Sequence, residues 1–194
     1  MKKNILSLAL CITVFSVSQP ANAQNNWSLE IRGDGASTTR EPAETDLGTG
    51  FGLEASLAYY FMPHLAVYGG WGWKNFTADR SWAGADADFE ETGYRFGLQF
   101  NHPLGDTGIN SLLSAGGIYS HIEVEDEHGT ISADSGHRFG GEAGVGLVIG
   151  LGERLSLIPN VRYHYLPATI TSNGQKQDAD LGYLSYGLSL AWTF

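Results

Sequence analysis

Apolar and polar residues alternate with a period of two along most of this chain, a pattern typical of β-strands that have one apolar face. The stretch 181–194 shows the alternation most clearly. One of its faces carries Leu184, Tyr186, Leu188, Leu190, Trp192 and Phe194. The opposite face is small or polar and carries Ser185, Gly187, Ser189, Ala191 and Thr193. The stretches 91–101 and 137–149 alternate in the same way, whereas the faces of 110–123 stay ambiguous.

The alternation predicts eight strands, separated by connections of two kinds. The predicted strands are 26–35, 47–61, 65–76, 91–101, 110–123, 137–149, 154–166 and 181–194. Three connections are tight and turn-like, with sequences "MPHL", "HPLGDTG" and "LGER". The other four are long and polar, at about 36–46, 77–90, 124–136 and 167–180. Short and long connections therefore alternate along the chain.

This layout predicts an all-β fold, an eight-stranded antiparallel up-and-down transmembrane β-barrel. A soluble lipocalin-like barrel would also alternate, with its apolar face turned inward. Two features favour lipid on the outside: the second face is too small and polar to line a dry cavity, and aromatic residues gather at strand ends as in interfacial girdles. These aromatic residues are Trp27, Tyr59, Phe61, Trp71, Trp73, Tyr163, Tyr165, Tyr183 and Trp192.

The first residues have the order of a secretory signal peptide. Lys2 and Lys3 precede an apolar run that is too short to span a membrane, and Ala23 offers a small residue for cleavage. We expect residues 1–23 to be the signal peptide and residues 24–194 to form the barrel. The chain has a formal net charge of −10, and removal of the two lysines makes the remainder more acidic. Because such a chain repels nucleic acid, no nucleic-acid partner is expected.

The phrases "FGLEASLAYYFMPHLAVYGGWGW" and "GGEAGVGLVIGLGERLSLIPNVRYHY" resemble small eight-stranded outer-membrane barrels of the OmpX, OmpA-transmembrane-domain and opacity-protein type. The resemblance implies a non-enzymatic protein of the bacterial outer membrane, in contact with outer-membrane lipid and lipopolysaccharide. It also implies a structural or surface-contact role, in adhesion or envelope integrity, with a host or surface ligand at the long loops. The final alternation resembles the C-terminal signal read by the outer-membrane assembly machinery, with aromatics at Tyr186, Trp192 and Phe194.

The inward face of the predicted barrel carries a set of ionic residues. They are Glu30, Arg32, Glu54, Lys74, Arg95, Arg138, Glu142 and Arg162. The lumen of eight strands is just wide enough for its own side chains, so these ions should pair with one another or with trapped water. We expect Glu142 to face Arg162, and Glu54 and Lys74 are a second candidate pair across the "MPHL" hairpin. A gated ion path is one interpretation, and a polar plug that fixes the barrel register is favoured over it.

The long loops hold most of the acidic residues, in "DADFEE" at 86–91 and "EVEDEHG" at 123–129. Divalent cations bind clustered carboxylates, but the spacing of a calcium loop is absent, and a solvated loop is the favoured interpretation. His121, His128 and His137 have no ligand spacing and are expected to be solvated loop histidines. No metal site and no cofactor are predicted.

Two further functions are weighed and disfavoured. Barrels that resemble the lipid A deacylase place Ser two residues after His, but here Leu166 follows His164 and Ser172 lies far along the loop. A lipid A-modifying enzyme is therefore disfavoured, and no catalytic residue is predicted. Passage of small hydrophobic molecules, as in the OmpW type, would need a dry apolar lumen with a lateral opening. The ionic inward face argues against that alternative.

Overall fold

The computed structural model describes residues 26–40, 46–80, 87–125, 131–172, 175–178 and 180–194, and every regular element among them is a β-strand. The predicted signal peptide and its cleavage site at Ala23 lie outside these ranges. The strands are β1 (Trp27–Arg40), β2 (Asp46–Met62), β3 (Leu65–Arg80), β4 (Ala87–Pro103), β5 (Ile109–Glu125), β6 (Ile131–Asp134), β7 (Arg138–Gly150), β8 (Leu155–Leu166), β9 (Thr169–Ser172), β10 (Gln175–Asp178) and β11 (Leu181–Thr193). In the described ranges no helix is long and apolar enough to cross a membrane.

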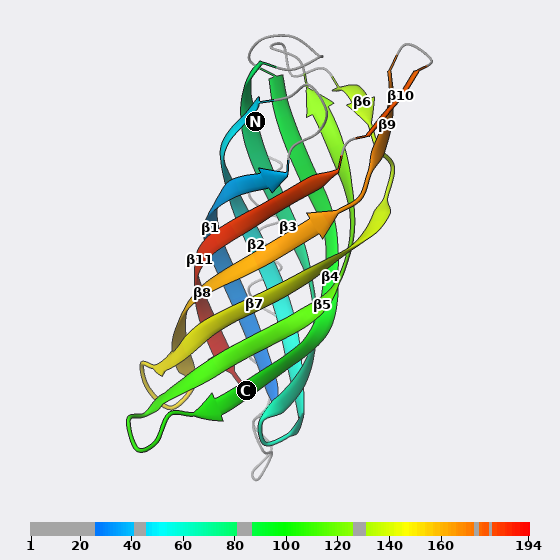
Figure 1. Ribbon diagram of the computed structural model, residues 1–194. Helices are drawn as coiled ribbons and strands as arrows, with labels where there is room; N and C mark the ends of the chain where they lie inside the picture. The colour runs from blue at the N-terminus through cyan, green and yellow to red at the C-terminus, as the bar shows by residue number, and fades with distance from the viewer. Residues whose placement is uncertain (1–25, 41–45, 81–86, 126–130, 173–174, 179) are drawn as a thin grey trace, which may run out of the picture.

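Eight of the strands close into an antiparallel barrel, which confirms the predicted fold (Figure 1). Each strand pairs with the next in the order β1, β2, β3, β4, β5, β7, β8, β11, and β11 pairs with β1. At the seam the amide of Phe194 donates to the carbonyl of Trp27 at 2.8 Å, and the amide of Trp27 donates back at 3.2 Å. Closure leaves no open edge in the eight-stranded wall, so neighbouring strands pair their backbone groups all around the barrel.

The two ends of the barrel differ in their connections. At the short-turn end, where the C-terminus lies, tight turns join β2 to β3, β4 to β5 and β7 to β8 (Figure 1). The β4–β5 turn holds Gly105 and Gly108 at φ values of 61° and 72°, a backbone conformation that favours glycine. The opposite, long-loop end carries β6, which pairs with the end of β5, and the β9–β10 hairpin. Both lie at the top of Figure 1.

The strands extend further toward the long-loop end than the alternation predicted. β3 runs to Arg80 and β4 begins at Ala87, whereas the sequence placed these boundaries at 76 and 91. β6 and the β9–β10 hairpin lie within segments predicted to be loops. The strand ladder depends on backbone pairing, so it can continue where both faces are polar and the alternation that marks a strand has ended.

The apolar face of the barrel points outward, as predicted. On β11, Leu188 and Trp192 are 53% and 49% exposed, whereas Ser185 and Ser189 are fully buried. The structure also settles the faces of β5, where Tyr119 points outward and Ile118 inward.

The prediction that Tyr183 belongs to the aromatic girdle is wrong. Its side chain is 2% exposed and lies inside the barrel rather than at the outer surface. The reason is parity: Tyr183 shares the inward face of β11 with Ser185 and Ser189.

Side chains fill the interior in three layers. An apolar cluster at the long-loop end includes Phe76, Phe89, Ile122, Leu166 and Tyr183. Two smaller clusters occupy the short-turn end, one around Ala66 and Tyr68 and the other around Leu112 and Ile158. Charged and polar residues fill the layer between these ends.

Candidate functional site

The central layer of the lumen contains seven of the eight predicted ionic residues. They are Glu30, Arg32, Glu54, Lys74, Arg95, Glu142 and Arg162, and each is buried. They come from six different strands, because alternate residues of every barrel strand point to the axis. Together with Asp34 and Glu91, these side chains are called the lumen network below.

Glu54 on β2 is the centre of the lumen network. Its carboxylate accepts hydrogen bonds from Arg32 Nη1 at 3.0 Å and from Arg162 Nη1 at 2.5 Å. Arg95 contacts the same carboxylate through its Nη1. The three arginines lie on β1, β8 and β4, so one carboxylate links strands around much of the barrel. Charge-assisted hydrogen bonds of this kind are stronger than neutral ones.

Glu142 and Glu30 extend the lumen network on either side of Glu54. Glu142 Oε1 lies 2.6 Å from Arg95 Nη2 and accepts a hydrogen bond from the Tyr68 hydroxyl at 2.5 Å. Glu30 Oε1 lies 3.1 Å from Arg162 Nη2. Arg95 and Arg162 therefore each bridge two carboxylates.

Neither of the two predicted ion pairs is formed as predicted. Glu142 was expected to face Arg162, but in the β7–β8 ladder it lies opposite His164, while Arg162 lies opposite Gly144. Glu54 was expected to pair with Lys74, but Gly72 is its register partner. Arg162 of β8 instead reaches Glu54 of β2 across the narrow lumen, because an eight-stranded barrel brings opposite walls within reach. Arg32 is the exception, since it lies directly opposite Glu54 in the β1–β2 ladder.

Lys74 pairs with Asp34, which was not among the predicted ionic residues of the lumen. Asp34 on β1 contacts both Lys74 Nζ and Arg32 Nη1. Glu91 was also missed; it is buried and accepts a hydrogen bond from the Tyr183 hydroxyl at 2.7 Å. Parity could have found both, since Asp34 shares a face with Arg32, and Glu91 shares one with Arg95.

Arg138 departs from the prediction that it belongs to the ionic interior. It is exposed at the first residue of β7, opposite Ser120, and no ion pair of Arg138 is seen among the described residues. At this end of the wall the guanidinium reaches water, so it needs no buried partner.

Little space remains within the lumen network. A cavity of about 30 Å³ is lined by residues that include Glu54, Glu91, Arg95, Glu142 and His164. This volume corresponds to about one water molecule. Glu142 Oε2, which is buried and makes no hydrogen bond within the described structure, offers such a water an acceptor.

A serine, a histidine and a glutamate lie in an order typical of hydrolases, yet they are sealed inside. His164 Nε2 lies 3.4 Å from Ser185 Oγ, and His164 Nδ1 lies 3.5 Å from Glu142 Oε2. Ser185, which comes from the neighbouring strand β11, was not among the predicted candidates, whereas Ser172 was. Ser185 is 0% exposed, and its hydroxyl already accepts a hydrogen bond from Arg32 Nη2 at 3.0 Å. No substrate can reach this oxygen, so the geometry does not provide a usable nucleophile.

A closed eight-stranded barrel with an apolar outer face and an ionic interior is a transmembrane barrel of the outer-membrane type. Residues 7–194 match the family described as "Outer membrane protein beta-barrel domain". The chain belongs to this family, and its location is the bacterial outer membrane. A search of curated proteins found no significant match.

Solved structures show the same fold at low sequence identity. Neisserial surface protein A is 15% identical, with a TM-score of 0.60, over 88% of this chain and 99% of that one. OprG from Pseudomonas aeruginosa is 15% identical, with a TM-score of 0.55, over 86% and 96%. Ail, the attachment invasion locus protein of Yersinia pestis, is 15% identical, with a TM-score of 0.52, over 87% and 100%. At these identities the likeness concerns the fold alone.

Proposed function

We propose that this protein is a non-enzymatic wall element of the outer membrane whose long-loop end makes contacts outside the cell, in adhesion or envelope integrity. The observation that carries the proposal is the filled lumen. The lumen network lies between apolar clusters at both ends, and its cavity holds about one water. A barrel with such an interior acts through its surfaces.

The long-loop end is the surface available for such contacts. In outer-membrane barrels the longer connections face the outside and the short turns face the periplasm. Here strands continue into that region, and β6 lies beside β9 of the β9–β10 hairpin (Figure 1). Strands offer a ligand a better-defined binding surface than irregular loops do.

The proposed partner differs in charge from the ligand named for one structural neighbour. The Ail structure is described as a complex with a heparin analogue, sucrose octasulfate. The present chain has a formal net charge of −10 and acidic long loops, which would repel a polysulfate. A basic host or surface ligand fits this surface better.

Other contacts of the protein follow from its outer wall. We propose that the outward apolar face contacts outer-membrane lipid and, in the outer leaflet, lipopolysaccharide. We also propose that β11 presents Tyr186, Trp192 and Phe194 to the assembly machinery. All three side chains point outward and are about half exposed.

Passage of small hydrophobic molecules is a second candidate, supported by one irregularity in the wall. The β7–β8 register runs to Gly146–Asn160 and resumes at Ile149–Leu157, and Pro159, which lacks an N–H, lies in the gap. An outer-surface depression here is lined by residues including Gly33, Pro159 and Leu188. Asn160 also lines the depression, and its Oδ1 accepts a hydrogen bond from Arg32 Nε at 2.8 Å. The depression therefore meets the lumen network rather than a dry apolar lumen.

Trimming the long loops tests the proposed function. A variant with residues 41–45, 81–86, 126–130 and 169–178 replaced by short Gly-Ser turns would be displayed on cells, and adhesion to host cells and to matrix proteins measured. We expect adhesion to fall to the level of cells without the protein. The matched control replaces Asp106 and Thr107 in the β4–β5 turn at the short-turn end and should adhere like the wild type. Unchanged adhesion and unchanged detergent resistance of cells with the trimmed, correctly folded barrel would contradict the proposal.

A further inference from the structure

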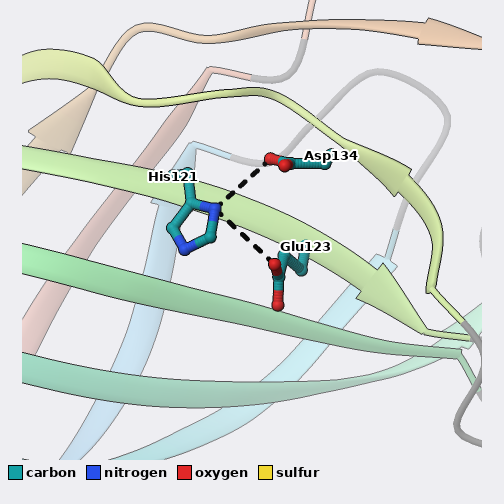
Figure 2. Close-up of side chains that lie close together, drawn as sticks. All are labelled: His121, Glu123 and Asp134. Atoms are coloured by element: carbon teal, nitrogen blue, oxygen red, sulfur yellow. Dashed lines mark hydrogen bonds and ion pairs between the residues drawn. The ribbon is translucent and has the colours of Figure 1, made fainter.

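Three potential metal ligands converge at the long-loop end of β5 (Figure 2). His121 and Glu123 lie on β5, and Asp134 is the last residue of β6. His121 Nδ1 is 3.3 Å from Asp134 Oδ1 and 3.7 Å from Glu123 Oε1. All three donor atoms lie within 4.8 Å of one another. In Figure 2 the imidazole nitrogen points toward both carboxylates.

The two carboxylates lie close enough together for a cation between them to offset their repulsion. Glu123 and Asp134 are direct register partners in the antiparallel β5–β6 pair. Like charges directly opposite each other destabilise such a pair. A bound cation removes the repulsion. A divalent ion does so more completely because its charge balances both carboxylates.

Neighbouring contacts hold the ligands in place. Asp134 Oδ1 accepts a hydrogen bond from the amide of Gly136 at 2.8 Å. The next residue, Ser135, is tied to Ile122 of β5 by two hydrogen bonds, of 2.9 Å to its hydroxyl and 3.0 Å from its amide. The His137 ring stacks on the His121 ring at 4.5 Å with an interplanar angle of 9°. Supporting contacts of this kind orient metal ligands.

We propose that His121, Glu123 and Asp134 form a zinc site that fastens β6 to the barrel wall. One imidazole and two carboxylates match the ligands of Zn²⁺, whereas Ca²⁺ takes six or more oxygens. The three protein ligands leave a fourth position of the tetrahedron open to water or to an external anion. Their side chains are 17%, 25% and 48% exposed, so an ion can enter from solvent. The site is independent of the adhesive role proposed above.

The sequence predicts no metal site here, because the ligand spacing within any one segment is not that of a metal site. His121 and Glu123 are two residues apart and share a face of β5, a pattern that is weak by itself. Asp134 completes the set only because β6 folds back along β5. His128, the other histidine of this region, lies outside the described residues.

Zinc titration of the purified full-length barrel in detergent, without an affinity tag, tests the proposal. Isothermal calorimetry with ZnCl₂ should show one high-affinity ion per chain, in the presence of excess Ca²⁺ as well as in its absence. Asp134→Asn and Glu123→Gln should each weaken binding by at least about tenfold. Heat-dependent migration on a gel would verify that each variant is folded. At a zinc concentration that just saturates the wild type, the ¹⁵N shift of His121 Nδ1 should move fully in the wild type and much less in Asp134→Asn.

A second histidine pair supplies the matched control. His64 and His102 lie at the short-turn end with their rings 5.9 Å apart, and both are exposed. The double variant His64→Ala/His102→Ala should bind zinc like the wild type. The proposal is overturned if zinc binding is absent from the wild type, if Asp134→Asn and Glu123→Gln bind zinc as tightly as the wild type, or if only the His64/His102 variant loses it.

Discussion

Glu54 is a single side chain that balances the charge of three buried arginines in the barrel interior. Its two oxygens serve three guanidinium groups, and each guanidinium is itself buried. Burial of an ion is costly unless its partner is present, so loss of the shared carboxylate leaves several cations uncompensated. The geometry at this residue therefore affects stability more than any exposed ion pair does.

Replacement of Glu54 by Ala should lower the free energy of unfolding by about 3–5 kcal/mol, the range measured when one partner of a buried ion pair is removed. Urea unfolding in detergent micelles, followed by tryptophan fluorescence, would measure the loss. Glu153→Ala is the matched control, because Glu153 is exposed in the β7–β8 turn. An equal, small effect of both substitutions would show that the buried contacts do not stabilise the barrel.

Gly187 tests how tightly the lumen network is packed. A Cβ at this position would lie 2.2 Å from Arg32 Nε, well inside contact distance. Gly187→Ala should therefore displace the guanidinium and destabilise the barrel by about 1–3 kcal/mol. Gly33→Ala is its counterpart on the outward face, where the nearest atom would be 3.9 Å away. Thermal unfolding of the two variants side by side would measure the difference, and equal midpoints would refute tight packing around Arg32.

For the strands, the sequence predicts which residues form a strand and which face they occupy better than it predicts which ionic side chains pair inside the barrel. The two-residue alternation reports directly which side chains share a face, and on β11 it placed Leu188 and Ser189 correctly. Ion pairs depend instead on the tilt and stagger of closed strands, which bring Arg162 of β8 to Glu54 of β2 across the lumen. No local pattern carries that information. The His121, Glu123 and Asp134 cluster could not be predicted either, because it depends on β6 folding back along β5 within a segment predicted to be a loop.

The closing strand should be sensitive at its last residue. Phe194 exchanges backbone hydrogen bonds with Trp27, and its ring is exposed on the outward face. Phe194→Ala keeps these backbone groups but removes the terminal aromatic, so we expect slower assembly with little change in final stability. Pulse-chase assembly in cells, read by heat-dependent gel migration, would measure the rate. Phe96→Ala removes an outward aromatic of similar exposure from β4 and should assemble normally. An assembly rate of Phe194→Ala equal to that of the wild type would exclude a role for Phe194 in the C-terminal assembly signal.

At the scale of the whole molecule, the barrel is a filled cylinder in lipid. Its outward face supplies the apolar band, and its interior supplies a cross-linked polar layer between apolar clusters. In a narrow barrel these cross-linked side chains leave little free space within the lumen network. The variable part of the molecule is then the long-loop end, where β6 and the β9–β10 hairpin lie.

Conductance of the purified protein in planar lipid bilayers tests the filled interior most directly. We expect no steady current steps above those of the lipid alone, under conditions in which gel migration shows that the barrel is folded and inserted. Disruption of the lumen network by Glu54→Ala should raise the frequency of transient openings, because the released arginines can draw in water. A steady, ohmic conductance of the wild-type protein would contradict the conclusion that side chains fill the interior of the barrel.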